Sequence, residues 1–307
     1  MRFGGHETFP VREGWLSRGL RLLMESPEAY EAKYPEDELG VGRNMYKSIR
    51  HWLVATELAE GNALRKGASR AMEPTELGRL IYSKDPFFLE EGTWWLLHVN
   101  LVNNPNRAMT WTWFFNHWTV PRFERGACVH ALERYVQSQS TRVPRLKTMD
   151  RDLGCLLASY TRKPSHDRED PEDTSESPFQ ELGLLAYHRS TGSYEYRRGV
   201  KRLPPAVFGY AAARSALQDP SLADEHRGVD RSLPDWERFP GGPGRCFQMD
   251  SEALFEAVHE FEQFGSDHGI RIQGLAGERR VQVEGKSLLD WAGQTYEEMT
   301  MVGNVCA

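Results

Sequence analysis

The sequence predicts a mainly α, α+β fold with a winged helix-turn-helix N-terminal region, a helical aromatic middle and a C-terminal helical portion with small hairpins. Three observations support this prediction. Apolar residues recur at helical spacing along much of the chain, tryptophans gather in continuous apolar runs in its middle, and short apolar runs flank turns near its end. Because 39% of the 307 residues are apolar and 11% are aromatic, the chain can bury a sizeable core, which excludes a disordered protein.

The N-terminal helices are amphipathic. Residues 11–25 carry leucines near helical spacing, and residues 26–42 hold at most a short helix. The next strong signal is residues 42–53, where Arg43, Lys47 and Arg50 recur at i, i+4 and i+7. The apolar residues of that stretch fall on a different face, so the predicted helix is apolar on one side and cationic on the other.

A short basic hairpin and a second helix, which begins near Thr75, follow the cationic helix. This order is typical of a winged helix-turn-helix, in which a cationic helix enters the major groove and wing residues reach phosphates. The alternative is a dimerisation or protein-docking module whose charge stripe is only a solvated face. The predicted DNA contacts are Arg43, Asn44, Lys47, Arg50, Arg65, Lys66 and Arg70.

Residues 87–118 contain five of the nine tryptophans. One interpretation is a platform on which bases stack. The favoured one is buried helical core, because runs such as residues 94–97 and 113–115 are continuously apolar. His98 and His117 are interpreted as hydrogen-bonded core or edge histidines, since no second metal ligand lies three or four residues away.

An acidic stretch at residues 163–178 is predicted to separate two domains. Residues 163–178 contain six acids, three prolines and no large apolar side chain, and are predicted to be a flexible loop. The expected domains are therefore 1–162, winged-helix and aromatic, and 179–307, acidic and α+β. The latter is predicted to hold a loop-rich stretch at 219–244, helices at 204–217, 252–264 and 288–299, and a hairpin of 270–272 with 281–283.

Charge is uneven along the chain, although its net value is −6. Residues 1–165 hold 23 Lys and Arg against 19 Asp and Glu, whereas residues 166–307 hold 15 against 25. The mildly basic half suits a polyanion, while the alternative is ordinary variation among solvated surfaces. No apolar run approaches the roughly 18 residues of a membrane span, and the N-terminus lacks a secretory signal, so a cytoplasmic protein is expected. Four cysteines lie far apart, at positions 128, 155, 246 and 306, which disfavours a disulfide framework or a structural zinc site.

Several short motifs carry a resemblance to a known family. The opening run is Phe3-Gly4-Gly5-His6-Glu7-Thr8-Phe9-Pro10, and further matches lie at 12–16, 42–45, 95–98, 112–116, 151–152, 177–178, 181–184 and 243–247. With these motifs the chain resembles an uncharacterised-domain family of bacterial DNA phosphorothioation loci, whose described member is the B component of the single-strand phosphorothioation system. The resemblance spans residue 3 to about residue 250 and is more specific in the N-terminal half.

The resemblance implies a protein that acts with a cysteine desulfurase, an ATPase and a sulfur-transfer enzyme to place sulfur in the DNA backbone as antiphage marking. It also implies DNA nicking, but no catalytic residues. The expected partners are double-stranded DNA and those enzymes, with a homodimer left open. Because the sequence has no phosphate-binding loop and no Cys/His catalytic signature, ATP hydrolysis and sulfur transfer are assigned to the partners.

Carboxylates are the candidates for metal-assisted hydrolysis of a phosphodiester, because Mg²⁺ needs converging acidic oxygens. We predict Asp150 and Asp152 as metal ligands and Asp150, Asp152 and Glu181 as catalytic residues. The alternative is that the two aspartates lie in the first turn of a helix and only offset its dipole. Asp267 with the Glu284-Gly285-Lys286 run forms a second candidate set. The His6-Glu7 pair either supplies a metal ligand or a base, or fixes the first helix to the core.

These observations leave three functional hypotheses open. The first is a Mg²⁺-dependent DNA nickase of a phosphorothioation system. The second is a non-enzymatic DNA-binding adaptor, and the third is a winged-helix transcriptional regulator. All three require that the cationic helix binds DNA.

Overall fold

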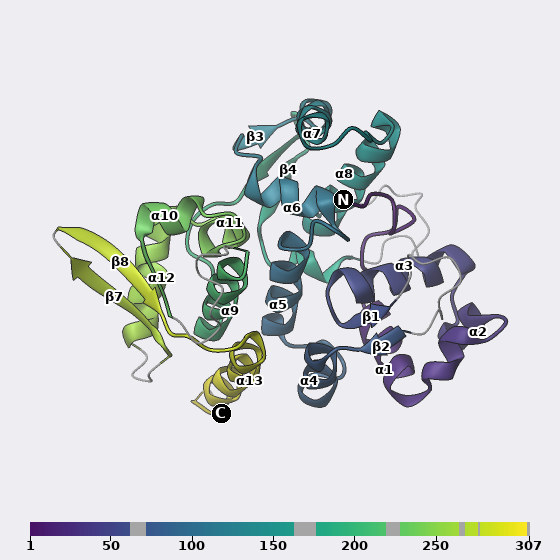
Figure 1. Cartoon of the computed structure of the whole chain (residues 1–307), viewed down its shortest axis with the longest axis horizontal. Coiled ribbons are helices and arrows are strands. Elements are labelled where there is room, and N and C mark those ends of the chain that lie inside the picture. Colours follow the sequence, from purple (N-terminus) through teal and green to yellow (C-terminus); the bar gives the residue numbers. More distant parts are fainter. Residues whose placement is uncertain (62–71, 163–175, 219–227, 264–267, 276, 306–307) are drawn as a thin grey trace. The chain divides into compact units, whose positions relative to one another are not determined.

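The computed structural model describes residues 1–61, 72–162, 176–218, 228–263, 268–275 and 277–305 (Figure 1). Over these residues the protein is mostly helical, with three small antiparallel sheets. The chain forms two compact units: residues 1–114 with 120–196, and residues 115–119 with 197–307. Among the helices of the described residues, none combines the length and the apolar character that crossing a bilayer requires.

The N-terminal part of the first unit contains helices followed by a two-stranded sheet and a further helix (Figure 1). Its elements are α1 (Trp15–Glu25), the 3-10 helix η1 (Pro27–Glu31), α2 (Pro35–Leu39), α3 (Arg43–Ala55), β1 (Ala59–Gly61), β2 (Met72–Pro74) and α4 (Glu76–Lys84). β1 and β2 are antiparallel, with Ala59 opposite Pro74. The helices predicted over 11–25 and 42–53 and after Thr75 are confirmed.

Local chemistry explains why α4 begins where it does. The Thr75 hydroxyl oxygen accepts a hydrogen bond from the Gly78 N–H at 2.9 Å, as expected for an N-cap residue. Gly78 lets the helix approach the chain that leaves α3, because a Cβ there would lie 2.1 Å from the Leu58 carbonyl oxygen. The sequence Thr-Glu-Leu-Gly therefore fixes both the start and the packing of α4.

Aromatic helices form the core of the first unit. These are α5 (Glu91–Val102) and α6 (Met109–Asn116). Trp95 and Trp111 are each 1% exposed, and the His98 ring is hydrogen-bonded to the Tyr160 hydroxyl at 2.8 Å. The prediction of a buried core is confirmed for these residues, whereas Phe87 is 61% exposed.

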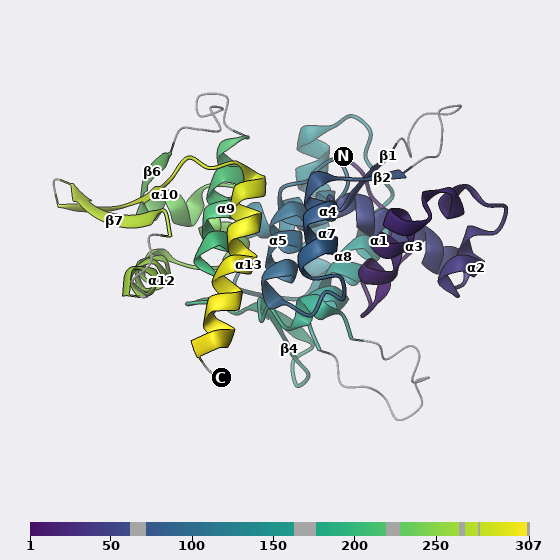
Figure 2. The ribbon, with the colours of Figure 1, turned by 90° about the horizontal axis from the view of Figure 1, so that it is seen from below.

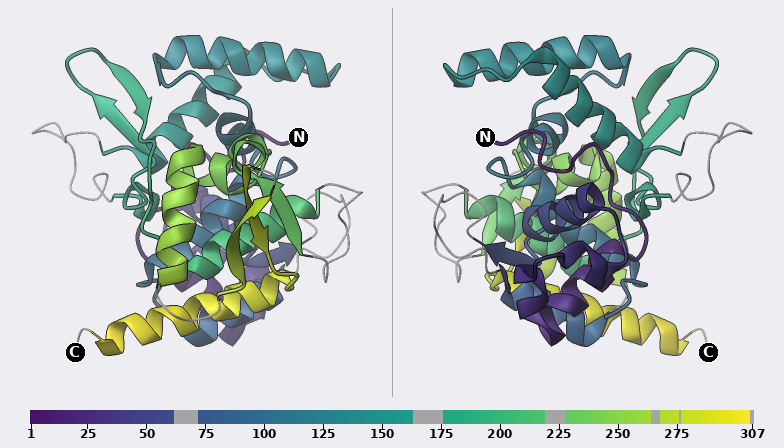
Figure 3. Two further views of the ribbon diagram at one scale, coloured as in Figure 1. Left: turned by 90° about the vertical axis from the view of Figure 1, so that its left-hand side faces the viewer. Right: turned by 90° about the vertical axis from the view of Figure 1, so that its right-hand side faces the viewer.

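The rest of the first unit is built from two long helices and a small sheet. Its elements are β3 (Arg122–Phe123), α7 (Arg125–Gln139), α8 (Leu146–Tyr160), η2 (Pro178–Gln180), β4 (Leu185–His188) and β5 (Ser193–Tyr196). The strand order is β3-β5-β4, and the hairpin of β4 and β5 can be followed in Figure 3. Because β5 pairs with β3, residues 179–196, expected in the second domain, lie in the first unit.

The second unit contains α9 (Pro205–Ala216), β6 (Val229–Ser232), α10 (Leu233–Arg238), α11 (Pro243–Phe247), α12 (Ser251–Gln263), β7 (Ile270–Leu275), β8 (Glu278–Val283) and α13 (Leu288–Val305). α9 and α13 lie side by side (Figure 2), since a Cβ on Gly209 would lie 2.5 Å from the Trp291 ring. The helices and the hairpin predicted near 204, 252, 270 and 288 are confirmed. Residues 219–227 of the loop predicted at 219–244 lie outside the described residues, and the remainder is corrected: β6, α10 and part of α11 lie there, around the buried Trp236.

Candidate nucleic-acid interface

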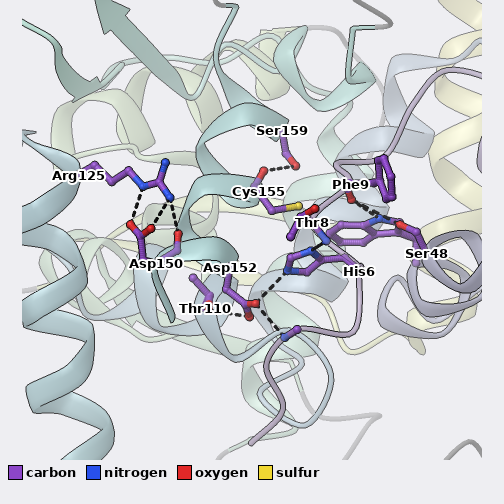
Figure 4. A network of polar contacts seen from close by, with 12 residues as sticks. His6, Thr8, Phe9, Ser48, Thr110, Arg125, Asp150, Asp152, Cys155 and Ser159 are labelled. Atoms are coloured by element: carbon purple, nitrogen blue, oxygen red, sulfur yellow. Dashed lines mark hydrogen bonds and ion pairs between the residues drawn. The ribbon is translucent and has the colours of Figure 1, made fainter. Parts of the chain in front are cut away.

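The N-terminal strap, residues 3–10, ties helix α3 to helix α8. Asp152 of α8 is 3% exposed, and its Oδ1 accepts hydrogen bonds from the Gly4 N–H at 2.8 Å and from His6 Nε2 at 3.1 Å (Figure 4). The Thr110 hydroxyl donates to the other carboxylate oxygen at 3.4 Å. Asp152 therefore holds the strap against α8 through a buried hydrogen bond to His6 and a part-buried one to Gly4.

The backbone of the strap selects the tautomer of His6. The Thr8 N–H lies 3.1 Å from His6 Nδ1, and a backbone N–H can only donate. Nδ1 is therefore the acceptor, and Nε2 carries the proton that is donated to Asp152. Both ring nitrogens of His6 serve the fold, as expected for a motif that fixes the N-terminal segment to the core.

The same strap positions α3. The Trp52 indole N–H donates to the Phe9 carbonyl oxygen at 3.0 Å, and the His6 ring stacks on Trp52 with centroids 5.8 Å apart. The Ser48 hydroxyl also donates to Phe9, at 3.5 Å, and Lys47 lies 3.7 Å from Glu7 (Figure 4 shows the Ser48 contact). The buried face of α3 is thus fixed by the strap, which leaves its opposite face to solvent.

A groove of about 680 Å³ lies between the outer face of α3 and the segment that contains η1 and α2. Cations, tyrosines and two acids line it. The lining residues are Tyr30, Glu31, Ala32, Lys33, Tyr34, Pro35, Glu36, Arg43, Tyr46, Lys47 and Arg50. The groove joins the cationic face predicted from the sequence to an aromatic wall from the preceding segment.

The tyrosines of the groove differ in exposure. Tyr30 and Tyr46 are buried: the Tyr30 hydroxyl donates to the Gly19 carbonyl at 2.7 Å, and the Tyr46 hydroxyl donates to the Tyr30 carbonyl at 3.2 Å. Burial, with Tyr46 nearby, raises the pKa of Tyr30 well above its usual value, so this ring stays uncharged. Tyr34 is 57% exposed, and the Lys33 ammonium lies 5.2 Å from the centroid of its ring.

The predicted DNA contacts on α3 face solvent. Arg43, Asn44 and Lys47 are exposed, and Lys47 donates to the Asn44 side chain at 3.3 Å. Arg50 is half-buried, and its Nε donates to the Met72 sulfur at 3.2 Å. The first turn of α3 contains no acid, so nothing there opposes an anion at the positive end of the helix dipole. Arg65, Lys66 and Arg70 lie outside the described residues.

The predicted catalytic carboxylates are not brought together. Asp150 forms a bidentate ion pair with Arg125 at 2.8 Å, whereas Asp152 is buried against the strap (Figure 4). Glu181 is paired with Arg162. The expectation that both aspartates lie in the first turn of a helix is corrected, because α8 begins at Leu146 and its first turn contains no acid.

The described residues contain no group of three or more His, Cys, Asp or Glu side chains that could hold a metal ion. Glu284, of the second predicted set, lies 3.0 Å from Lys286, and Asp267 lies outside the described residues. The part of the chain that the structure describes therefore offers no cluster of three or more such donors to enclose Mg²⁺.

The aromatic wall of the groove was not predicted from the sequence. Lys33, Tyr34 and Pro35 lie in the stretch expected to hold only a short helix. The available signal was an aromatic residue beside a lysine, directly before a helix that starts with proline. That pattern is short, and only the fold brings it opposite Arg43 and Lys47.

Comparisons with known proteins agree with this fold. Two crystal structures are similar to the chain, one described as magnesium ion-bound SspB, with a TM-score of 0.80 and 26% identity, and one described as SspB, with a TM-score of 0.80 and 25% identity. In each case the match covers 97% of this chain and 87% of the other. None of the curated proteins matches the chain.

The family resemblance drawn from the sequence motifs is confirmed, since an SspB-like fold extends over nearly the whole chain. A family model described as a protein of unknown function, DUF4007, matches residues 3–295, a range that includes the N-terminal strap, the groove and most of the second unit. The chain therefore belongs to the DUF4007 family.

Proposed function

We propose that this protein is the DNA-binding component of a bacterial DNA phosphorothioate modification system and that it contacts duplex DNA through the outer face of α3. The observation that carries the proposal is the groove lined by Lys33, Arg43, Lys47 and Arg50. Clustered cations on one helix face attract the phosphate backbone, and their contribution does not depend on base sequence.

The order of the elements around α3 supports this proposal. The helices α1, α2 and α3 precede the antiparallel pair β1 and β2, and this order is consistent with a winged helix-turn-helix, in which we propose α3 as the recognition helix. Arg65, Lys66 and Arg70 follow β1 in the sequence. We propose that they bind DNA phosphates beside the major groove that α3 enters.

The family context supports the proposed partners. The chain is similar to SspB, and the motif resemblance links such proteins to phosphorothioation loci. We propose that the protein acts with a cysteine desulfurase, an ATPase and a sulfur-transfer enzyme, to which it delivers or prepares DNA. An adaptor of this kind binds DNA without catalysing a reaction. A second proposal is that the protein also nicks DNA.

The nicking proposal includes Mg²⁺ because one similar structure is described as magnesium ion-bound. No group of three or more His, Cys, Asp or Glu side chains gathers among the described residues. Asp150, Asp152 and Glu181 remain the proposed catalytic residues. Their separate partners, Arg125, His6 and Arg162, mean that each can be tested alone.

Duplex binding at several salt concentrations tests the proposed DNA contact. Replacing Arg43 and Lys47 together with alanine should weaken binding and reduce the slope of log K against log salt by about 0.9 for each phosphate that is no longer neutralised. Arg134→Ala removes one positive charge from the exposed face of α7 and serves as the control. Unchanged affinity and slope in the double variant would exclude α3 as the DNA-binding surface.

Incubation with supercoiled plasmid separates the adaptor from the nickase. Conversion to open circles in Mg²⁺, and not in EDTA, is the result expected of a nickase. Duplex binding without conversion is the result expected of an adaptor, and sequence-specific binding at a promoter would favour the transcriptional regulator. Addition of the three partner enzymes to the same reaction tests whether cutting depends on them.

A further inference from the structure

The groove beside α3 has the composition of a site for a nucleotide, in addition to duplex phosphates. Its volume of about 680 Å³ lies within the roughly 300–1,000 Å³ of pockets that enclose small ligands. A flat surface with clustered cations is sufficient to bind duplex DNA. The concave shape of the groove and its aromatic wall therefore indicate a further ligand.

Charge is distributed unevenly within the groove. Arg43, Lys47 and Arg50 belong to α3, whereas the acids Glu31 and Glu36 belong to η1 and α2. Lys33 lies with these acids, so the other side is mixed in charge, and a phosphate is attracted most strongly to the α3 side. Carboxylates on that other side can accept hydrogen bonds from the N–H groups of a base.

Tyr34 supplies a surface on which a base can stack. The residue is 57% exposed, with the Lys33 ammonium 5.2 Å from the ring centroid, and the hydroxyls of the two buried tyrosines are already bonded to backbone carbonyls. Stacking on an exposed aromatic ring is sequence-tolerant, because every base has a π-face. The groove thus combines a ring for stacking with a cationic side for phosphate.

We propose that this groove binds one unpaired nucleotide of a DNA strand, with its phosphate at Arg43 and Lys47 and its base on Tyr34. This inference rests on the proposed function, since it places the nucleotide in the same surface that engages the duplex. A base can enter only after it leaves the stack, so the protein favours DNA with an extrahelical or single-stranded position.

The test compares a perfect duplex with the same duplex carrying one extrahelical 2-aminopurine nucleotide. The full-length protein should bind the bulged duplex more tightly, and Tyr34→Ala should weaken that affinity alone by roughly five- to 150-fold, the effect of losing one stacked base. Tyr34→Phe keeps a ring and should retain the preference. Quenching of 2-aminopurine fluorescence should accompany binding by wild type and Tyr34→Phe.

Controls separate failure of this inference from failure of the proposed function. Tyr82→Ala removes a tyrosine from α4, outside the groove, and should leave the preference intact. Equal affinity for both duplexes, or an unchanged preference in Tyr34→Ala, overturns the nucleotide site even if Arg43→Ala still weakens duplex binding. Free deoxyadenosine monophosphate that competes as well as the bulged duplex would also overturn it, because the ligand would then be a free nucleotide.

Discussion

Two helices of the first unit were expected to be functional, α3 for its cations and α8 for its carboxylates. The charged side chains of the two helices differ in their exposure and in their partners. On α3, Arg43 and Lys47 face solvent beside a groove, and Lys47 has an exposed hydrogen bond to Asn44 and an ion pair at 3.7 Å to Glu7. On α8, Asp152 is buried and fully engaged, and Asp150 is paired with Arg125. The cations are available to a ligand, whereas the carboxylates serve the internal structure of the unit.

This difference shows what a helical charge pattern can and cannot reveal. Long basic side chains at i, i+4 and i+7 reach solvent whenever the opposite face of their helix is buried, so their exposure follows from local sequence. The role of an aspartate depends on what folds against it. Gly4, 148 positions away in the sequence, makes Asp152 an anchor.

Removal of the Asp152 carboxylate should destabilise the protein more than any of the substitutions that follow. Asp152→Ala leaves the buried His6 Nε2–H without its acceptor and the Gly4 N–H to water, and we expect it to lower the free energy of unfolding by about 2–4 kcal/mol. Urea denaturation measures this loss. A stable Asp152→Ala variant that binds DNA but no longer nicks it would instead support the catalytic prediction.

A smaller effect is expected where the strap meets α3. A Cβ on Gly5 would lie 2.3 Å from Nδ1 of the buried His51, so Gly5→Ala should displace that ring or the strap, at a cost of about 1–3 kcal/mol in the free energy of unfolding. Gly126→Ala in α7 meets no atom within 4 Å and is the matched control. We expect that control to be neutral or to stabilise the helix by up to about 1 kcal/mol.

Acid should weaken the same region. Burial, reinforced by His6, Arg2 and Arg107, lowers the pKa of His51 well below its ordinary value of 6.5. Because the unfolded chain then binds a proton that the folded protein does not, the contribution of His51 to stability is complete above pH 6.5 and is lost as pH falls below it.

Thermal or urea unfolding between pH 7 and pH 5 measures that loss. The slope contributed by His51 can reach about 1.4 kcal/mol per pH unit below the unfolded pKa. His51→Gln removes the titrating group, so its stability should depend less steeply on pH over this range. An equal slope in wild type and His51→Gln would show that other groups cause the acid sensitivity.

The sequence was informative wherever the decisive contacts are local. The helices around Trp15 and Trp52 follow from apolar periodicity, the helix around Trp95 follows from a continuous apolar run, and the start of α4 follows from Thr75 as its cap. The C-terminal hairpin also follows from local alternation. These elements needed no knowledge of distant residues.

Contacts between distant segments account for what could not be predicted. β5 pairs with β3 across some 70 residues, which places the hairpin in the first unit. α10 has only six residues and contains Pro234, too short for a periodic signal, although Trp236 anchors it in the core. The groove depends on Tyr34 lying opposite Arg43, which is a property of the fold alone.

Asp150 lies on the same helix as Asp152 and should contribute far less to the free energy of unfolding. Asp150 and Arg125 are both more than a third exposed, so their ion pair is partly screened by water, and Asp150→Asn should cost no more than about 1 kcal/mol of unfolding free energy. Urea denaturation of Asp150→Asn beside Asp152→Ala measures the contrast between two acids that lie two residues apart. Since Asp150 lies outside the residues that line the groove, duplex affinity should not change. A loss of stability equal to that of Asp152→Ala would show that the Arg125 pair is as important to the fold as the buried strap, and the division between an exposed ion pair and a buried anchor would no longer hold.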